Sequence, residues 1–106
     1  MNADREPTTN LHLLPAREAD LPVVQNLSGY YIYDFTEHLG WPCPESGRFG
    51  GCDEMFADWR AGRNYLFVIR VGGELAGFAA VGVDVAQREF FVQEFFLLRK
   101  FRRQGI

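Results

Sequence analysis

The residue types best suited to chemistry lie in a basic, glycine-bearing turn, Arg102-Arg103-Gln104-Gly105-Ile106, directly after an apolar segment. A strand that runs into a turn and then a helix presents unpaired backbone N–H groups and the positive end of the helix dipole at one place. Gly105 would let the backbone approach an anion without a Cβ in the way. Arg102 and Arg103 add positive charge and guanidinium donors. The turn is therefore a candidate site for a phosphate or pyrophosphate.

The distribution of charge also favours an anionic ligand at this end of the chain. The formal net charge is −3, but from Arg88 onward five basic residues oppose two acidic ones, a local charge of +3 that leaves −6 for residues 1–87. Because the acidic remainder would repel a polyanion, a small anionic ligand is favoured over nucleic acid. A solvated basic turn is the alternative, since charge runs are common on protein surfaces.

Composition places the chain among globular proteins. Of 106 residues, 47% are hydrophobic and 15% aromatic, which is enough to bury a core. No run approaches 18 apolar residues and the polar start lacks the form of a secretion signal, so we expect a cytoplasmic protein with no membrane partner. Cys43 and Cys52 are expected to be free thiols, and with His12 and His38 they lack the close spacing of a zinc site. No metal is expected.

The first half of the chain predicts a short strand, a long helix, a loop and a short helix. Residues 11–14 form the strand candidate, closed by a proline. Apolar residues at spacings of three and four predict a helix from about Leu21 to Leu39, starting after Asp20. Residues 42–51 carry two prolines and three glycines and predict a loop. Asp53 is expected to cap the short helix, which stops at Gly62.

The second half predicts an antiparallel meander. Residues 65–71 and 75–85 are strand candidates joined by Gly72-Gly73, a two-residue hairpin signal, and residues 90–98 form a third strand after a turn. The third strand is apolar on both faces, which is typical of a strand in the middle of a covered sheet. We therefore expect a further strand beside it. That strand would be the first strand crossing over, or would come from residues outside this chain or from a second chain, as in a homodimer or strand-swapped assembly.

Order and motifs together resemble the N-terminal part of the GCN5-related N-acetyltransferase (GNAT) superfamily. The family's turn reads Gln or Arg, x, x, Gly, x, then Gly or Ala, and residues 102–106 supply five of these six positions. Residues 94–102 and the hairpin 72–78 add to the likeness, and residues 33–37 resemble a subgroup of uncharacterised bacterial acetyltransferases.

The resemblance implies an α+β fold of three-layer type with a mostly antiparallel sheet. The chain would be a single incomplete domain over residues 1–106, with a flexible start over residues 1–10. It would correspond to about the first two thirds of a family domain and end before the C-terminal helix and strands. A fragment of this kind is expected to be inactive alone, because it lacks the second wall of the cofactor cleft.

The resemblance also implies transfer of an acetyl group from acetyl-CoA to the amine of an unknown small-molecule or peptide acceptor. The backbone N–H groups of Arg103, Gln104, Gly105 and Ile106 would cradle the pyrophosphate, with Arg102 beside them. The backbone of Phe96, Leu97 and Leu98 would pair with the pantetheine arm. The N–H of Leu97 would polarise the thioester carbonyl, which is oxyanion-type stabilisation.

Such a reaction needs a neutral amine, and Glu94 is the candidate base that removes its proton. It is a carboxylate in an apolar strand near the thioester end, where desolvation favours proton uptake. The alternative is an ion pair with Arg88 or Arg99, and Glu89 is a weaker candidate base. In the family a tyrosine from the C-terminal third commonly protonates the departing thiolate. None of the four tyrosines of this chain is assigned that role: Tyr30, Tyr31, Tyr33 and Tyr65.

The long helix and its loop would bound the acceptor site. Their aromatic residues, Tyr30, Tyr31, Tyr33, Phe35 and Trp41, line that pocket or belong to the core. Asp34 and Glu37 attract a cationic amine or form a solvated face. Two other functions remain open: a non-catalytic half-domain that completes its sheet with a partner or a second copy, and, disfavoured by the net acidity, a nucleic-acid-binding domain.

Overall fold

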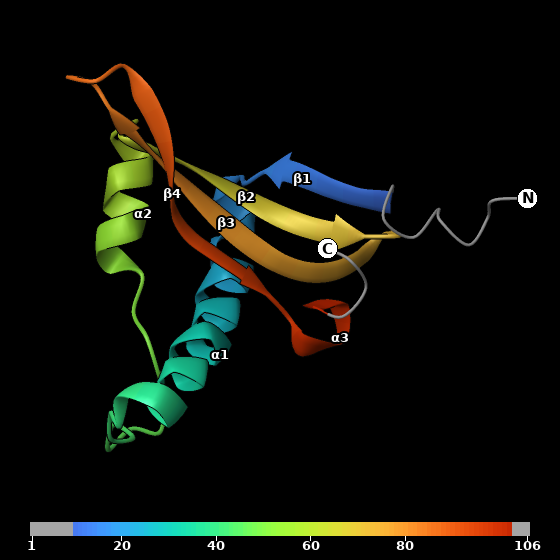
Figure 1. The fold of residues 1–106 in the computed structure, drawn as a ribbon, viewed down its shortest axis with the longest axis vertical. Coiled ribbons are helices and arrows are strands. Elements are labelled where there is room, and N and C mark those ends of the chain that lie inside the picture. Colours follow the sequence, from blue (N-terminus) through green and yellow to red (C-terminus); the bar gives the residue numbers. More distant parts are fainter. Residues whose placement is uncertain (1–9, 103–106) are drawn as a thin grey trace, which may run out of the picture.

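A computed structural model describes residues 10–102, which form a four-stranded antiparallel sheet with helices (Figure 1). The strands are β1 (Leu11–Pro15), β2 (Asn64–Val71), β3 (Glu74–Asp84) and β4 (Glu89–Leu97), in the spatial order β1-β2-β3-β4. Each strand pairs antiparallel with its neighbour. This confirms the predicted α+β class and the meander joined at Gly72-Gly73.

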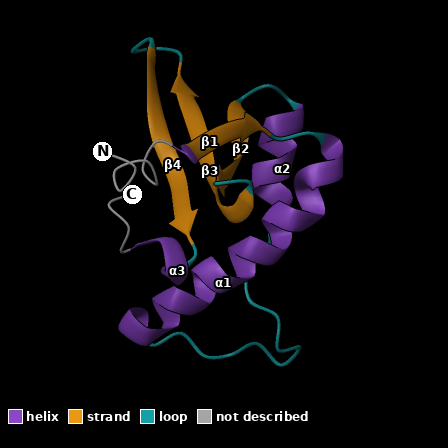
Figure 2. Cartoon of the chain, turned by 90° about the vertical axis from the view of Figure 1, so that its right-hand side faces the viewer, coloured by secondary structure: helices purple, strands orange, loops and turns teal. Residues whose placement is uncertain are grey.

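Within residues 10–102 the sheet is accompanied by three α-helices: α1 (Leu21–Leu39), α2 (Asp53–Arg60) and the single turn α3 (Arg99–Arg102). A short 3-10 turn, η2 (Glu18–Asp20), precedes α1. Figure 2 shows α1 and α2 together on one side of the sheet, with α3 beside the end of β4. The helix predicted over residues 21–39 is confirmed with these bounds. It ends at Gly40, whose φ of 70° lies in the left-handed region that glycine adopts without strain.

The predicted start of α2 is wrong by one residue. Asp53 is the first residue of the helix and does not cap it, because Cys52 takes the N-cap position. The Cys52 side chain is only 2% exposed, so burial in the core fixes the chain there. The Asp53 carboxylate still lies in the first turn, where it interacts favourably with the helix dipole.

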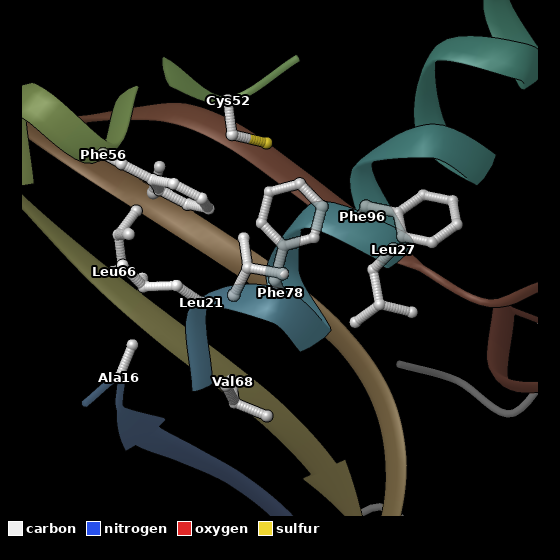
Figure 3. Packing of buried hydrophobic residues seen from close by; sticks show 11 residues of the cluster. Ala16, Leu21, Leu27, Cys52, Phe56, Leu66, Val68, Phe78 and Phe96 are labelled. Carbon is white, nitrogen blue, oxygen red and sulfur yellow. The ribbon is translucent and has the colours of Figure 1, made fainter. Parts of the chain in front are cut away.

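The main core lies between α1, α2 and the sheet (Figure 3). Its most buried large side chains are Val24 of α1, Leu66 of β2 and Phe78 of β3. A second cluster on the opposite face includes Leu97 at the end of β4 and Phe101 of α3. Leu97 is therefore anchored by its side chain at the point where β4 runs into α3.

Among the described residues, β4 lies at an edge of the sheet, so the alternative that the first strand crosses over to it is wrong. A further strand from residues outside this chain or from a second chain stays a prediction. β1 pairs with β2 at the opposite edge and does not cross over to β4. Short hairpin connections place consecutive strands side by side, which puts the last strand outermost. Several apolar side chains of β4 are exposed as a result: Phe90 69%, Phe91 47%, Val92 66% and Phe95 50%.

Two irregularities in strand pairing shape the end of β4. The register of β2 with β3 shifts between Ile69 and Arg70, which leaves Ala76 as an extra residue on β3. The register of β3 with β4 shifts between Ala80 and Val81, which leaves Gln93 as an extra residue on β4. Such bulges bend a strand and change which face later side chains occupy. Glu94 and the residues after it are positioned by the second shift.

Candidate active site

The predicted pyrophosphate turn falls outside the described residues. Arg103, Gln104, Gly105 and Ile106 are not among residues 10–102, so their role stays a prediction. The described part of the predicted cofactor site comprises residues 96–98 and Arg102. These lie together at the junction of β4 with α3.

The backbone of Leu97 points toward the open edge of the sheet. The Leu98 N–H donates to the carbonyl oxygen of Ala76 at 2.8 Å, and Phe96 stands opposite Phe78 in the same ladder. In an antiparallel pair, alternate residues direct both backbone groups toward the partner strand or away from it. Phe96 and Leu98 therefore bond to β3, whereas Leu97 directs its N–H and C=O outward. Of the three residues predicted to pair with pantetheine, Leu97 is the one whose backbone is oriented for it.

A cleft of about 570 Å³ adjoins this edge, and we call it the edge cleft. It lies between the C-terminal half of α1, the end of β4 and α3. Its lining residues are Tyr31, Asp34, Phe35, Glu37, His38, Phe95, Phe96, Leu97, Arg99 and Arg102. The outward backbone of Leu97 therefore borders a hollow large enough for part of an extended ligand.

The positive charges beside the edge cleft are held by one carboxylate. Asp34, on α1, pairs with Arg102 at 2.7 Å and with Arg99 at 3.3 Å. The Arg102 Nε also donates to the carbonyl oxygen of Leu97 at 2.7 Å, and its guanidinium lies 5.3 Å from the centre of the Phe96 ring. Asp34 is therefore neither a solvated residue nor an open site for an amine. Arg102 acts in this structure as a clamp on the edge residue Leu97.

Glu94 lies on the helix-facing side of β4. It stands opposite Ala80, two residues before Phe96, and both of those neighbours belong to the main core. Among residues 10–102, Glu94 forms no ion pair with Arg88 or Arg99, the two partners weighed from the sequence. Arg99 pairs with Asp34, and Arg88 belongs to the turn before β4.

A second hollow of about 360 Å³ lies under α1, and we call it the inner pocket. Residues of α1, the following loop, α2 and the sheet line it: Ser28, Tyr31, Ile32, Phe35, Trp41, Gly51, Cys52, Glu54, Met55, Phe78 and Glu94. Tyr31 and Phe35 line both the inner pocket and the edge cleft. These two side chains therefore form the boundary between the two spaces.

Tyr31 and Glu94 interact at this boundary. Burial, and then a hydrogen bond to the Glu94 side chain together with its charge, raise the pKa of Tyr31 to about 12. The Tyr31 phenol is therefore neutral at neutral pH and lies beside the Glu94 carboxylate. Burial also raises the pKa of the Cys52 thiol; a hydrogen bond from Ser28 opposes the rise, and the charges of Asp53 and Glu94 add to it.

The sequence placed Tyr31 in the acceptor pocket or the core but assigned it no chemical role. Its position in the apolar stripe of α1 indicates burial, and a buried phenol requires a hydrogen-bond partner. That requirement was the available signal, but it does not identify Glu94, which lies 63 positions later in the chain. The arrangement brings a candidate base, a phenol and the outward N–H of Leu97 around two adjacent spaces that share Tyr31 and Phe35 as lining residues.

No helix within residues 10–102 is long and apolar enough to span a membrane. In the same range no three side chains of the metal-binding types come together. Cys43 is exposed and Cys52 is buried, and both are free thiols as predicted.

Comparison with known proteins adds one match. A family model described as "Acetyltransferase (GNAT) family" matches residues 32–106, which is more than half of the chain. A search of curated proteins found no match. The matched segment begins within α1 and includes β4 with the outward backbone of Leu97. The chain therefore belongs to the GNAT acetyltransferase family.

Proposed function

We propose that this protein transfers an acetyl group from acetyl-CoA to an amine, with the acyl donor in the edge cleft and the amine in the inner pocket. The outward backbone of Leu97 beside the edge cleft carries the proposal. Family membership supports acetyl transfer in general. The reaction joins the amine nitrogen to the thioester carbonyl carbon, the C–S bond breaks, and the thiolate leaves with the bonding electrons.

On the donor side, the Leu97 N–H would hydrogen-bond the thioester oxygen as negative charge develops on it. The hydrogen bond from Arg102 to the Leu97 carbonyl oxygen holds the Leu97 backbone in its outward orientation before substrate binds. Such preorganisation is effective because the donor need not rearrange during the reaction. Backbone N–H groups of residues 103–106 would hold the pyrophosphate, as the sequence predicts.

On the acceptor side, Glu94 would take the proton that the amine loses, directly or through one water. Glu94 lines the inner pocket together with Tyr31, and the interaction between them raises the pKa of the Tyr31 phenol. Tyr31 is then a positioning residue that orients the carboxylate. Because Tyr31 also lines the edge cleft, the base lies one side chain away from the donor site.

We expect the 106-residue chain alone to turn over acetyl-CoA poorly. Within residues 10–102 no strand faces the open edge of β4, so only one wall of the donor cleft is formed. Variants of residues that contact the acyl donor are therefore assayed in the natural gene product.

The role of the Leu97 N–H can be tested with a proline. Leu97→Pro removes the N–H, and because that group points away from β3, no ladder bond is lost. We expect kcat to fall by about 10²–10³-fold, the usual cost of one oxyanion donor. Leu97→Ala keeps the N–H and should retain most of kcat. The assay is transfer of radiolabelled acetyl from acetyl-CoA to an amine substrate.

A matched control exists at the opposite edge of the sheet. Leu13 of β1 also directs its N–H outward. The Ala16 N–H donates to the carbonyl oxygen of Leu66 on β2, and because alternate residues of an antiparallel strand face the partner strand, Leu13, three positions before Ala16, faces away from it. Leu13→Pro should leave kcat unchanged. If Leu97→Pro and Leu13→Pro behave alike while both remain folded, the oxyanion assignment is wrong.

A further inference from the structure

The inner pocket has an aromatic wall. Tyr31 packs edge-to-face on Phe35 with ring centres 4.9 Å apart, Phe35 on Trp41 at 6.2 Å, and Tyr31 on Phe78 at 6.0 Å. All four rings line the pocket, with Ile32 and Met55 beside them. Rings held in fixed mutual geometry make a surface for another apolar or aromatic group, and their faces attract a cation.

The charge of the pocket is negative. Glu54 of α2 and Glu94 of β4 both line it, and none of the described residues that line it is a lysine or arginine. The negative charge of Glu94 reaches the Tyr31 phenol and the Cys52 thiol, which border the same space. A ligand with one positive group beside these carboxylates and an apolar body against the rings would match both features.

The volume limits the ligand to a small molecule. About 360 Å³ lies near the lower end of the range of about 300–1,000 Å³ typical of small-molecule sites. A more polar neighbouring space, lined by Glu54, Asp58, Gln93 and Glu94 among others, could receive a second positive charge. Asp58, however, already pairs with Arg63 at 3.0 Å. A ligand with one cationic group therefore matches the available carboxylates better than a ligand with several.

We propose that the acceptor is a small primary monoamine with an aromatic or branched apolar body, bound with its nitrogen beside Glu54 and Glu94. The apolar body lies against Phe35, Trp41 and Met55. This inference names the substrate class of the acetyl transfer proposed above and rests on that function. The site that it uses is formed by described residues of α1, α2, the intervening loop and the sheet.

Binding can be measured without any acyl donor, because Trp41 lines the pocket. We would titrate the 106-residue chain with 2-phenylethylamine and follow tryptophan fluorescence. The chain has two tryptophans, and Trp59 does not line the pocket. The fluorescence change should persist in Trp59→Phe and vanish in Trp41→Phe. A change that persists in Trp41→Phe and vanishes in Trp59→Phe would overturn the proposed site.

The contributions of the positive charge and of the apolar body can be separated by comparing 2-phenylethylamine with three other probes. We expect 2-phenylethylamine to bind at least about tenfold more tightly than 2-phenylethanol, which lacks the cation but keeps the ring. It should also bind more tightly than spermidine or a short lysine-containing peptide. Equal affinity for the alcohol, or tighter binding of spermidine or the peptide, would overturn the assigned substrate class.

Substitutions test which residues contact the positive nitrogen of the amine and which contact its apolar body. Glu94→Gln and Glu54→Gln should each weaken 2-phenylethylamine about three- to tenfold, and Phe35→Ala about tenfold. Glu45→Gln, an exposed loop residue that does not line the pocket, should have no effect. Unchanged affinity in both Glu94→Gln and Glu54→Gln would refute the charge contact.

The two proposals can fail separately. Failure of amine binding in the chain, with acetyl transfer to some other acceptor intact in the natural gene product, would overturn the monoamine inference alone. Amine binding with no acetyl transfer by the natural gene product would overturn the proposed reaction and leave the pocket as a binding site.

Discussion

Replacing Gly77 with alanine should damage both the fold and the donor site, although Gly77 lines neither space described above. A Cβ at Gly77 would overlap the carbonyl oxygen of Phe96, and it would lie 2.9 Å from the carbonyl carbon of Phe96 and 3.0 Å from the Leu97 Cα. All three are backbone atoms, so no side-chain rotation can relieve the overlap. The end of β4 must move away from β3, carrying Leu97 with it.

The cost can be worked from these contacts. Overpacking in a well-packed region costs about 1–3 kcal/mol. Displacing β4 also weakens the bond from Leu98 N–H to Ala76, at about 0.5–1.5 kcal/mol. Together these give about 1.5–4.5 kcal/mol of lost unfolding free energy, and each kcal/mol lowers Tm by about 4–8 °C in a domain of this size. We therefore expect Tm to fall by at least about 6 °C.

Two other glycines provide a graded comparison. A Cβ at Gly51 would meet nothing within 4 Å, so Gly51→Ala should leave Tm nearly unchanged. At Gly82 the Cβ would meet only the Phe91 and Gln93 side chains, which can move, so Gly82→Ala should give an intermediate loss. Thermal unfolding followed by circular dichroism measures all three. If Gly77→Ala melts within about 2 °C of Gly51→Ala, the close backbone approach at β4 is refuted.

Two further perturbations probe the charges around the site. Asp34→Asn releases Arg99 and Arg102 from their shared carboxylate and makes the edge cleft more positive, so the natural gene product should bind acetyl-CoA about two- to fivefold more tightly at low salt, with a steeper salt dependence. Calorimetric affinity that falls, or that matches Glu45→Gln, would contradict this. Tyr31, whose folded-state pKa of about 12 exceeds the value of 10 of an unperturbed tyrosine, contributes stability that is complete below pH 10 and is lost as pH rises through 12. Tyr31→Phe should therefore flatten the decline of Tm between pH 10 and 12 relative to the wild type and to Tyr65→Phe; parallel curves for all three proteins would rule out the phenol as its source.

Local signals in the sequence determined the elements and the family. The stripe on α1 repeats every three or four residues and stops at a glycine, so its bounds required no knowledge of the rest of the molecule. Gly72-Gly73 between two alternating apolar segments fixed the hairpin of β2 and β3 for the same reason. The basic glycine turn after β4 gave the family resemblance, which the match over residues 32–106 confirms.

Tertiary structure decided which edge β4 occupies and which of its backbone groups face outward. One extra residue in a strand reverses the faces of all residues after it, and the shift at Gln93 follows from packing against β3, which no local pattern in β4 encodes. The pairing of Asp34 with two arginines more than 60 positions away, and of Tyr31 with Glu94, likewise depends on how α1 lies across the sheet. Sequence periodicity reports the environment of each residue along its own element, whereas the site is made of contacts between elements that only the packed chain brings together.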